Sequence, residues 1–257
     1  MLKALRMAEE AYEEAKELED HFLKARTLQA LASIHYSLSQ YEEATHFYLE
    51  SIREADQSRV PGSPFFMQCY SYLSSMAKEL NRPDEGLRYA DSMYVEVSRY
   101  KANRPAQDVQ VYYFWAENAR AISYAELKQP DEALSAIRRM EAMYDLQWAE
   151  RNAVNAVLID DAYGAYCHIT GQYDKALLHL ERTMKHYQNT NNFTSELKIK
   201  NRMEAVHLLA TLDKTKYPIE EIGVMSGFND HSTFYRAFKK STGVSPSTFR
   251  KNLTVSV

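Results

Sequence analysis

Polar and basic side chains fall at helical spacing near the C-terminal end of the chain. Ser232, Arg236 and Lys239 would share one face of a helix. Phe234 and Phe238 are four residues apart and would share the opposite face, where we expect them to be buried. Guanidinium and ammonium groups bind phosphate oxygens, and arginine also matches paired acceptors on a base edge. The pattern therefore indicates contacts with phosphate groups or bases, although a solvated basic face is the simpler alternative.

A short helix and a tight turn must precede this helix to present its polar face. Pro218 suits the first position of a helix in which Ile222 points inward. Gly227 supplies the turn, because positive φ costs glycine nothing. Asp230 is a good N-cap for the basic helix, and Gly243 is suited to end it.

Further residues complete a compact group of helices. Gly223 is small at the point where two helices should cross closely, and Phe228 should fill the core between them. Ser245 and Pro246 cap and start a last helix, while residues 194–213 predict one long helix upstream. A helix, a glycine turn and a second basic helix form the outline of a helix-turn-helix unit.

This tail resembles the second half of the AraC/XylS-type DNA-binding domain. The matches are Ile-x-x-Ile over 219–222, Gly-Phe-x-Asp over 227–230, Ser-x-Phe-x-Arg-x-Phe-Lys-Lys over 232–240 and Gly-x-Ser-Pro-Ser-x-Phe-Arg over 243–250. The resemblance implies a transcription regulator whose second recognition helix enters the major groove of double-stranded DNA. It implies that His231, Ser232 and Arg236 face bases. The residues that it places nearer phosphates are Thr233, Lys239, Lys240 and Arg250.

The resemblance covers only part of the family's domain. The family joins two helix-turn-helix units through a long helix, which residues 194–213 match. The first unit is missing, because the last repeat directly precedes this helix. A single half-domain makes few contacts with bases. We therefore expect either a homodimer, in which a second copy supplies the other half of the DNA-binding surface, or weak DNA binding. A deletion product or partial gene is another interpretation.

Charge is distributed unevenly between the two parts of the chain. Residues 1–195 carry 21 basic and 29 acidic side chains, whereas residues 196–257 carry 10 basic and 6 acidic. The net charges are therefore −8 and +4. A basic tail on an acidic body is the asymmetry expected when only the tail meets phosphate.

A four-residue signature recurs along residues 1–192, each time after a short polar step. Proline or tyrosine followed by acidic residues suits a helix start, because carboxylates favour the positive N-terminal end. The small fourth residue lets two helices approach closely. The copies begin at positions 41, 83, 130 and 173, so they are 42, 47 and 43 residues apart. They are Tyr41-Glu-Glu-Ala44, Pro83-Asp-Glu-Gly86, Pro130-Asp-Glu-Ala133 and Tyr173-Asp-Lys-Ala176.

Helical runs surround each signature, so the pattern predicts four pairs of helices joined by tight turns. One pair cannot bury its apolar face alone, and such pairs stack into a superhelix. Residues 1–18 indicate a single second helix, which suggests that the chain begins inside a longer array.

The pattern resembles tetratricopeptide repeats (TPR), with two departures. The spacing exceeds the usual period of about 34 residues, and the tryptophan common early in the first helix is missing. The resemblance implies a protein or peptide partner on the concave face; a scaffold or oligomerisation platform without such a ligand is the alternative. The concave face would carry Gln29, Ser33, Tyr36, Ser71, Ser75, Asn118, Ile122 and Asp161.

Other features of the sequence argue against a secreted protein, a membrane-spanning protein and a metal- or nucleotide-dependent enzyme. The N-terminus is charged from its third residue, unlike a secretory signal, and no apolar run reaches membrane-spanning length. Two distant cysteines favour a reducing cytoplasm over a disulfide framework. Phosphate-loop and metal-binding motifs are missing from the sequence. We therefore expect no catalytic residues, no cofactor and no metal site, and predict that the protein is not an enzyme.

Together these observations predict an all-α protein. A TPR-like α-α superhelix, or solenoid, would occupy residues 1–192, and a small helix-turn-helix half-domain with its linker helix would occupy 193–257. The leading hypothesis is a sequence-specific DNA-binding transcription regulator whose repeats contact a protein or sense a signal. The alternative is a TPR-type adaptor in which the truncated helix-turn-helix mainly caps the last repeat.

Overall fold

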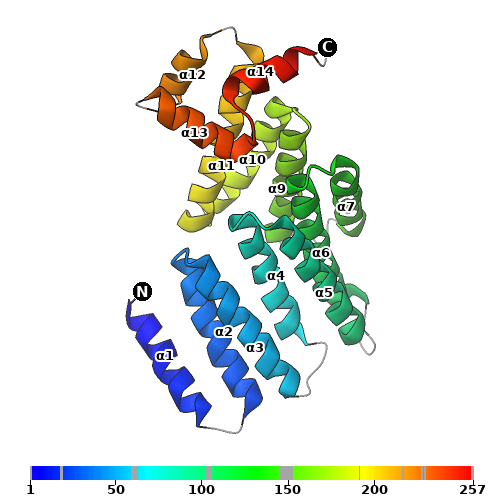
Figure 1. Cartoon of the computed structure of the whole chain (residues 1–257). Helices are drawn as coiled ribbons and strands as arrows, with labels where there is room; N and C mark the ends of the chain where they lie inside the picture. The colour runs from blue at the N-terminus through cyan, green and yellow to red at the C-terminus, as the bar shows by residue number, and fades with distance from the viewer. Residues whose placement is uncertain are drawn as a thin grey trace. The chain divides into compact units, whose positions relative to one another are not determined.

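Every secondary-structure element in the described residues of the computed structural model is an α-helix, as predicted (Figure 1). The helices form two compact units, residues 1–169 and 170–257. None of the described helices combines the length and the apolar character needed to cross a bilayer. The structure describes residues 2–17, 20–58, 63–101, 106–144, 153–190, 192–215, 217–226, 228 and 230–255.

The first unit is a stack of helix pairs. Within it α2 packs on α3, α4 on α5 and α6 on α7, and the first helices of successive pairs also touch, α4 with α6 and α6 with α9. This order is the stacking that the repeat pattern predicts. The helices are α1 (Leu2–Lys16), α2 (His21–Ser37), α3 (Tyr41–Gln57), α4 (Pro64–Glu79), α5 (Pro83–Lys101), α6 (Ala106–Glu126), α7 (Pro130–Met143) and α9 (Ala153–Ile169).

The four polar steps share one backbone conformation. Ser39, Asn81, Lys128 and Gly171 all have a left-handed φ, at 60°, 55°, 58° and 72°. In the first three steps the next residue's amide donates to the carbonyl five residues before it, with N–O distances of 2.8 to 3.0 Å. This bond ends a helix by satisfying one of its last carbonyls. The recurrence confirms that the signatures mark equivalent turns.

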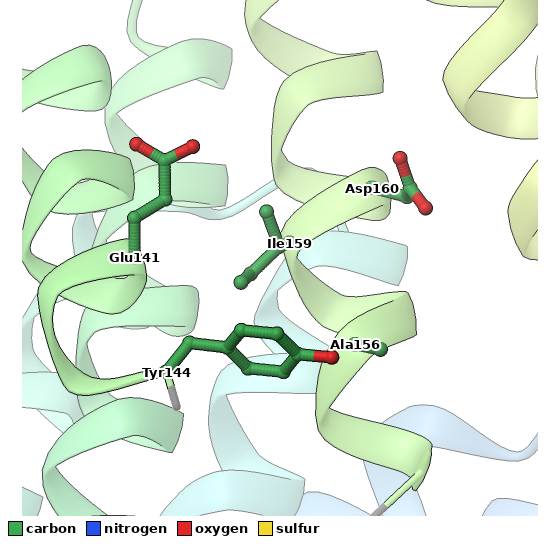
Figure 2. Close-up of a pocket in the computed structure, with 5 residues that line it drawn as sticks. All are labelled: Glu141, Tyr144, Ala156, Ile159 and Asp160. Carbon is green, nitrogen blue, oxygen red and sulfur yellow. The ribbon is translucent and has the colours of Figure 1, made fainter. Parts of the chain in front are cut away.

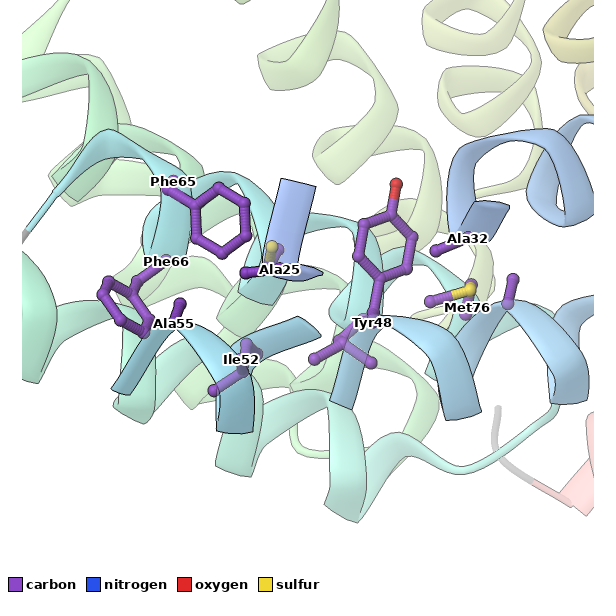
Figure 3. Packing of buried hydrophobic residues seen from close by; sticks show 11 residues of the cluster. Ala25, Ala32, Tyr48, Ile52, Ala55, Phe65, Phe66 and Met76 are labelled. Atoms are coloured by element: carbon purple, nitrogen blue, oxygen red, sulfur yellow. The ribbon is translucent and has the colours of Figure 1, made fainter. Parts of the chain in front are cut away.

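The small residues that close the signatures lie where the helices meet. Ala44, Ala133 and Ala176 are fully buried, and Gly86 is buried as well. Figure 3 shows part of the core around the first signature, in which Tyr48 and Ile52 of α3 pack among alanines of α2 and the aromatic start of α4. The signature therefore works as a packing contact, as the sequence indicates.

The second unit contains the predicted long helix and three short helices. Helix α10 packs along α11, which also contacts α12 and α14, while α13 contacts both α12 and α14. The predicted helix over 194–213 is confirmed by α11. The predicted domain boundary at 192/193 differs from the division into compact units at 169/170, because α10 groups with α11. The helices are α10 (Tyr173–Asn189), α11 (Phe193–Lys214), α12 (Ile219–Met225), α13 (His231–Thr242) and α14 (Pro246–Val255).

Candidate nucleic-acid interface

Helices α12 and α13 cross closely at a glycine. Pro218 is the N-cap of α12, and Ile222 is fully buried. A Cβ atom on Gly223 would lie 3.0 Å from Cδ1 and 3.1 Å from Cγ of Phe234. These distances are tighter than ordinary van der Waals contact, so the predicted close crossing is confirmed. The predicted turn residue, Gly227, lies outside the described residues.

The ends of α13 are fixed as predicted. The carboxylate of Asp230 accepts a hydrogen bond from the Thr233 amide, with an N–O distance of 2.8 Å. The side-chain and backbone hydrogen bonds of Thr233 hold the pKa of the Asp230 carboxyl below its usual value. Gly243 ends the helix with φ of 81°, and its amide donates to the Lys239 carbonyl at 2.9 Å. The amide of Thr248 donates to Ser245 Oγ at 3.1 Å, so Ser245 caps the next helix.

One face of α13 is buried and carries phenylalanines. Phe234 is fully buried, and Phe238 is 3% exposed. Their rings pack against Phe228 and Phe249, with centroid distances of 5.3 and 5.6 Å. The burial of this face turns the polar residues of the helix toward solvent. The exposed residues of α13 include the predicted contact residues His231, Ser232, Thr233, Arg236 and Lys239. The side chain of Lys240 lies outside the described residues.

The guanidinium of Arg236 lies along its own helix. Its Nε donates to the Ser232 carbonyl at 3.3 Å, and its Nη2 lies 3.5 Å from Thr233 Oγ1. These are long contacts for an exposed group, and hydrogen bonds weaken with distance. An exposed guanidinium held this loosely can exchange them for shorter bonds to a base or a phosphate. The structure thus brings Ser232, Thr233 and Arg236 together on one surface.

His231 makes two contacts that the residue pattern does not predict. Its Nε2 lies 3.3 Å from Glu220 Oε1 on α12, and its ring lies 4.3 Å from the Tyr235 ring, centroid to centroid. The sequence explains Glu220 by its place in the first turn of α12, where carboxylates are favoured. Its contact with His231 depends on the angle between α12 and α13, for which the sequence carries no local signal.

Arg250 makes an internal contact rather than facing outward. Its Nη1 donates to the backbone carbonyl of Tyr217, with an N–O distance of 2.7 Å. Its Nε and Nη2 are buried, and neither has a hydrogen-bond partner within the described part of the chain. This placement joins α14 to the segment before α12 and does not favour the predicted phosphate contact.

Seven of the eight predicted concave-face residues of the first unit are half-buried, and the eighth, Ile122, is buried. Tyr36 and Ser75 meet across α2 and α4 with their hydroxyl oxygens 3.3 Å apart, and Asp161 lies 3.5 Å from Lys78 Nζ. Ile122 is 6% exposed and packs in the core, so its assignment to an exposed face is corrected. Helical spacing alone did not distinguish a core position from a neighbouring surface position on α6. The remaining half-buried positions are Gln29, Ser33, Ser71 and Asn118.

The first unit also contains a pocket of about 440 Å³ between the end of α7 and α9 (Figure 2). Glu141 and Tyr144 line one side, and Ala156, Ile159 and Asp160 line the other. Burial and a hydrogen bond to Glu141 raise the pKa of Tyr163, beside this pocket, to about 12. No group of three His, Cys, Asp or Glu residues in the described ranges could hold a metal ion.

Comparison with known proteins identifies a helix-turn-helix segment near the C-terminus. Residues 179–252 match a family model described as a helix-turn-helix domain, of the AraC type. The matched segment starts within α10, upstream of the predicted boundary. The C-terminal segment is thus a helix-turn-helix domain of a DNA-binding type.

Most of the chain is similar in structure to the crystal structure of BtubC (BKLC) from P. vanneervenii. The TM-score is 0.53 at 16% sequence identity, over 89% of this chain and 93% of that chain. At this identity the likeness concerns the fold, and the paired helices resemble a TPR-like protein. No curated protein matches the chain.

Proposed function

We propose that this protein is a sequence-specific transcription regulator that binds double-stranded DNA through α13. The observation that carries the proposal is the exposed polar and basic face of α13, opposite the buried Phe234 and Phe238, within a segment that matches a helix-turn-helix domain. In this proposal His231, Ser232 and Arg236 contact bases, while Thr233, Lys239 and Lys240 contact phosphates. The cytoplasmic location predicted from the sequence is part of the same proposal.

A titration of labelled duplex DNA tests this proposal. Each phosphate neutralised by a basic side chain adds roughly −0.9 to the slope of log affinity against log salt concentration. We expect a negative slope, and tighter binding to duplexes selected from a random pool than to the pool itself. Binding that is insensitive to salt, or no binding even by a dimer, would contradict the proposal.

We further propose that two copies of the chain bind together. The predicted missing first helix-turn-helix unit leaves a single α13 per chain, and one recognition helix makes few base contacts. A homodimer would place two such helices on half-sites one or more helical turns apart, about 10 base pairs each. Selected duplexes should then contain two related half-sites. A single unrepeated site would indicate that the protein binds DNA as a monomer.

The repeat unit, in this proposal, serves protein contact or sensing rather than catalysis, so the chain is not an enzyme. Its support is the TPR-like fold and the half-buried polar residues Gln29, Ser33, Tyr36 and Ser75 on α2 and α4. Crosslinking through a photoreactive residue at position 33, compared with the same residue at exposed position 46 on α3, would identify a partner and the face that it uses.

A second candidate function is that of an adaptor whose C-terminal helices cap the repeats. The packing of α10 along α11 favours it, because the last predicted repeat helix is thereby covered. The open end of a repeat array needs such a cover. Deleting residues 193–257, which removes α11 together with the helices that follow it, distinguishes the two functions. A soluble product that binds its partner with unchanged stability would argue against the capping role.

A further inference from the structure

His231 lies between two side chains at the start of α13. Glu220 approaches it from α12, with its Oε1 atom 3.3 Å from Nε2, and the Tyr235 ring lies one turn along on α13 at an interplanar angle of 41°. The Tyr235 hydroxyl in turn lies 3.4 Å from Ser247 Oγ on α14. The imidazole therefore lies beside α12 and reaches α14 through Tyr235. Figure 1 shows these three short helices in the C-terminal part of the chain.

The contact between His231 and Glu220 is on the surface, with side chains 45% exposed for His231 and 67% for Glu220. Exposed pairs of this kind add little to folding stability. A carboxylate beside the N-terminal end of a DNA-binding helix is also repelled by the phosphates that the helix approaches. The first turn of α12 favours a carboxylate at Glu221 as much as at Glu220, so the consequence particular to Glu220 is its effect on the imidazole beside it.

Orientation of the imidazole matters because its two nitrogens are not equivalent in hydrogen bonding. With Nε2 beside the Glu220 carboxylate, Nδ1 is the ring nitrogen left for a base edge. The Tyr235 ring limits rotation of the imidazole on the other side. An imidazole that could rotate would offer either nitrogen and discriminate less between base pairs.

We propose that Glu220 is a specificity-determining residue that acts from outside the recognition helix by positioning His231. The inference rests on the proposed DNA binding by α13 and names a residue to which the family resemblance assigns no role. Glu220 lowers overall affinity through its charge and sharpens the choice of base opposite His231.

Glu221 provides a matched control on the same turn of α12. It is exposed and carries the same charge, but the carboxylate beside His231 is that of Glu220. Glu220→Gln and Glu221→Gln therefore remove the same charge from the same turn. They differ in whether the charge that is removed lies beside the imidazole.

The test measures base preferences of the full chain with a randomised duplex pool at fixed salt concentration. His231→Ala identifies the position that His231 reads. We expect Glu220→Gln to reduce the preference there about two- to fivefold, a range set by the small energies of exposed ion pairs. Glu221→Gln should keep the wild-type preference, and both variants should bind the unselected pool more tightly. Glu220→Gln combined with His231→Ala should lose no more preference at that position than His231→Ala alone.

Two results would overturn the inference: wild-type preference in Glu220→Gln, or equal loss in Glu221→Gln. Circular dichroism of each variant shows whether the helices are retained. A wild-type protein without any sequence preference would overturn the proposed function itself, and the inference with it. That failure appears in the wild-type measurement, whereas failure of the inference alone appears only in the variants.

Discussion

The guanidinium of Arg139 on α7 forms a bidentate ion pair with the carboxylate of Glu117 on α6. Its Nε and Nη2 donate to the two carboxylate oxygens at 2.7 and 2.9 Å, and Glu117 is only 1% exposed. The Tyr94 hydroxyl of α5 donates to the same carboxylate, and Arg120 Nη1 lies 3.6 Å from it. A buried carboxylate needs such partners, because burial without them is costly. The network therefore ties three successive helices of the repeat stack together.

Arg139→Ala should destabilise the repeat unit by about 3 kcal/mol, because the carboxylate of Glu117 stays buried after losing its two shortest arginine bonds. Both tryptophans of the chain, at positions 115 and 148, fall within residues 1–169, so tryptophan fluorescence during urea unfolding follows this unit. The neighbouring Arg138 is exposed, and Arg138→Ala should change stability by less than about 0.5 kcal/mol. Equal effects of the two changes would contradict this account.

Gly223→Leu should destabilise the contact between α12 and α13 by about 1–3 kcal/mol, because a side chain there overlaps the Phe234 ring. Hydrogen-exchange mass spectrometry of peptides from 219–242 should show faster exchange. Val224 is 70% exposed, so Val224→Leu serves as the control and should leave exchange unchanged. Tryptophan fluorescence should report the same unfolding of the first unit in both variants. Unchanged exchange in Gly223→Leu would show that the ring moves aside at little cost.

Elements with strong local signals could be predicted from the sequence. The cap at Asp230 and the left-handed end at Gly243 depend on residue types that favour one backbone conformation. The four polar steps could be located because each directly precedes a copy of the signature. The burial of Phe234 and Phe238 follows from their spacing on one helix. In each case the deciding interaction joins residues close in sequence, so the pattern of residues contains it.

Features that depend on how helices cross could not be predicted in the same way. The burial of Ile122 and the internal bond of Arg250 depend on neighbours from other helices. The pairing of Glu220 with His231 is likewise set by the angle between α12 and α13. The grouping of α10 with α11 also arises from packing, which the repeat signature at Tyr173 does not reveal. Periodicity predicts the face of a helix, but the depth of each position and the partner that it meets come from tertiary structure.

Arg236→Ala should relax base preference, and Lys239→Ala should weaken binding to all duplexes alike. An arginine bound to two acceptors of a guanine contributes about 1–3 kcal/mol of discrimination. A lysine on a phosphate carries no sequence information but adds roughly −0.9 to the salt slope. Selection from a random pool, together with a salt titration of each variant, separates the two roles. An equal loss on all sequences for Arg236→Ala would make it a phosphate contact.

The cap of α13 should weaken in acid. The hydrogen bonds from Thr233 lower the pKa of Asp230 in the folded protein, so its contribution to stability is complete above the unfolded-state pKa. That contribution is lost as pH falls through the lower folded-state pKa. Asparagine also caps helices but does not titrate in this range. We expect the protection of α13 amides to fall more between pH 6 and about 3 in the wild type than in Asp230→Asn. Parallel curves for the two proteins would contradict the expectation.

Arg250→Ala distinguishes an internal role from the phosphate contact that the family resemblance implies. The bond from Nη1 to the Tyr217 carbonyl fixes the start of α12 against α14, so its loss should reduce DNA affinity indirectly. Affinity should then fall for all duplexes while the salt slope stays unchanged, because no phosphate contact is removed. Amide exchange around 217–222 should become faster in the free protein. Lys239 on α13 is exposed, and Lys239→Ala should leave that exchange unchanged. A salt slope reduced by about 0.9 in Arg250→Ala, with unchanged exchange, would instead show that its guanidinium leaves Tyr217 to bind a phosphate.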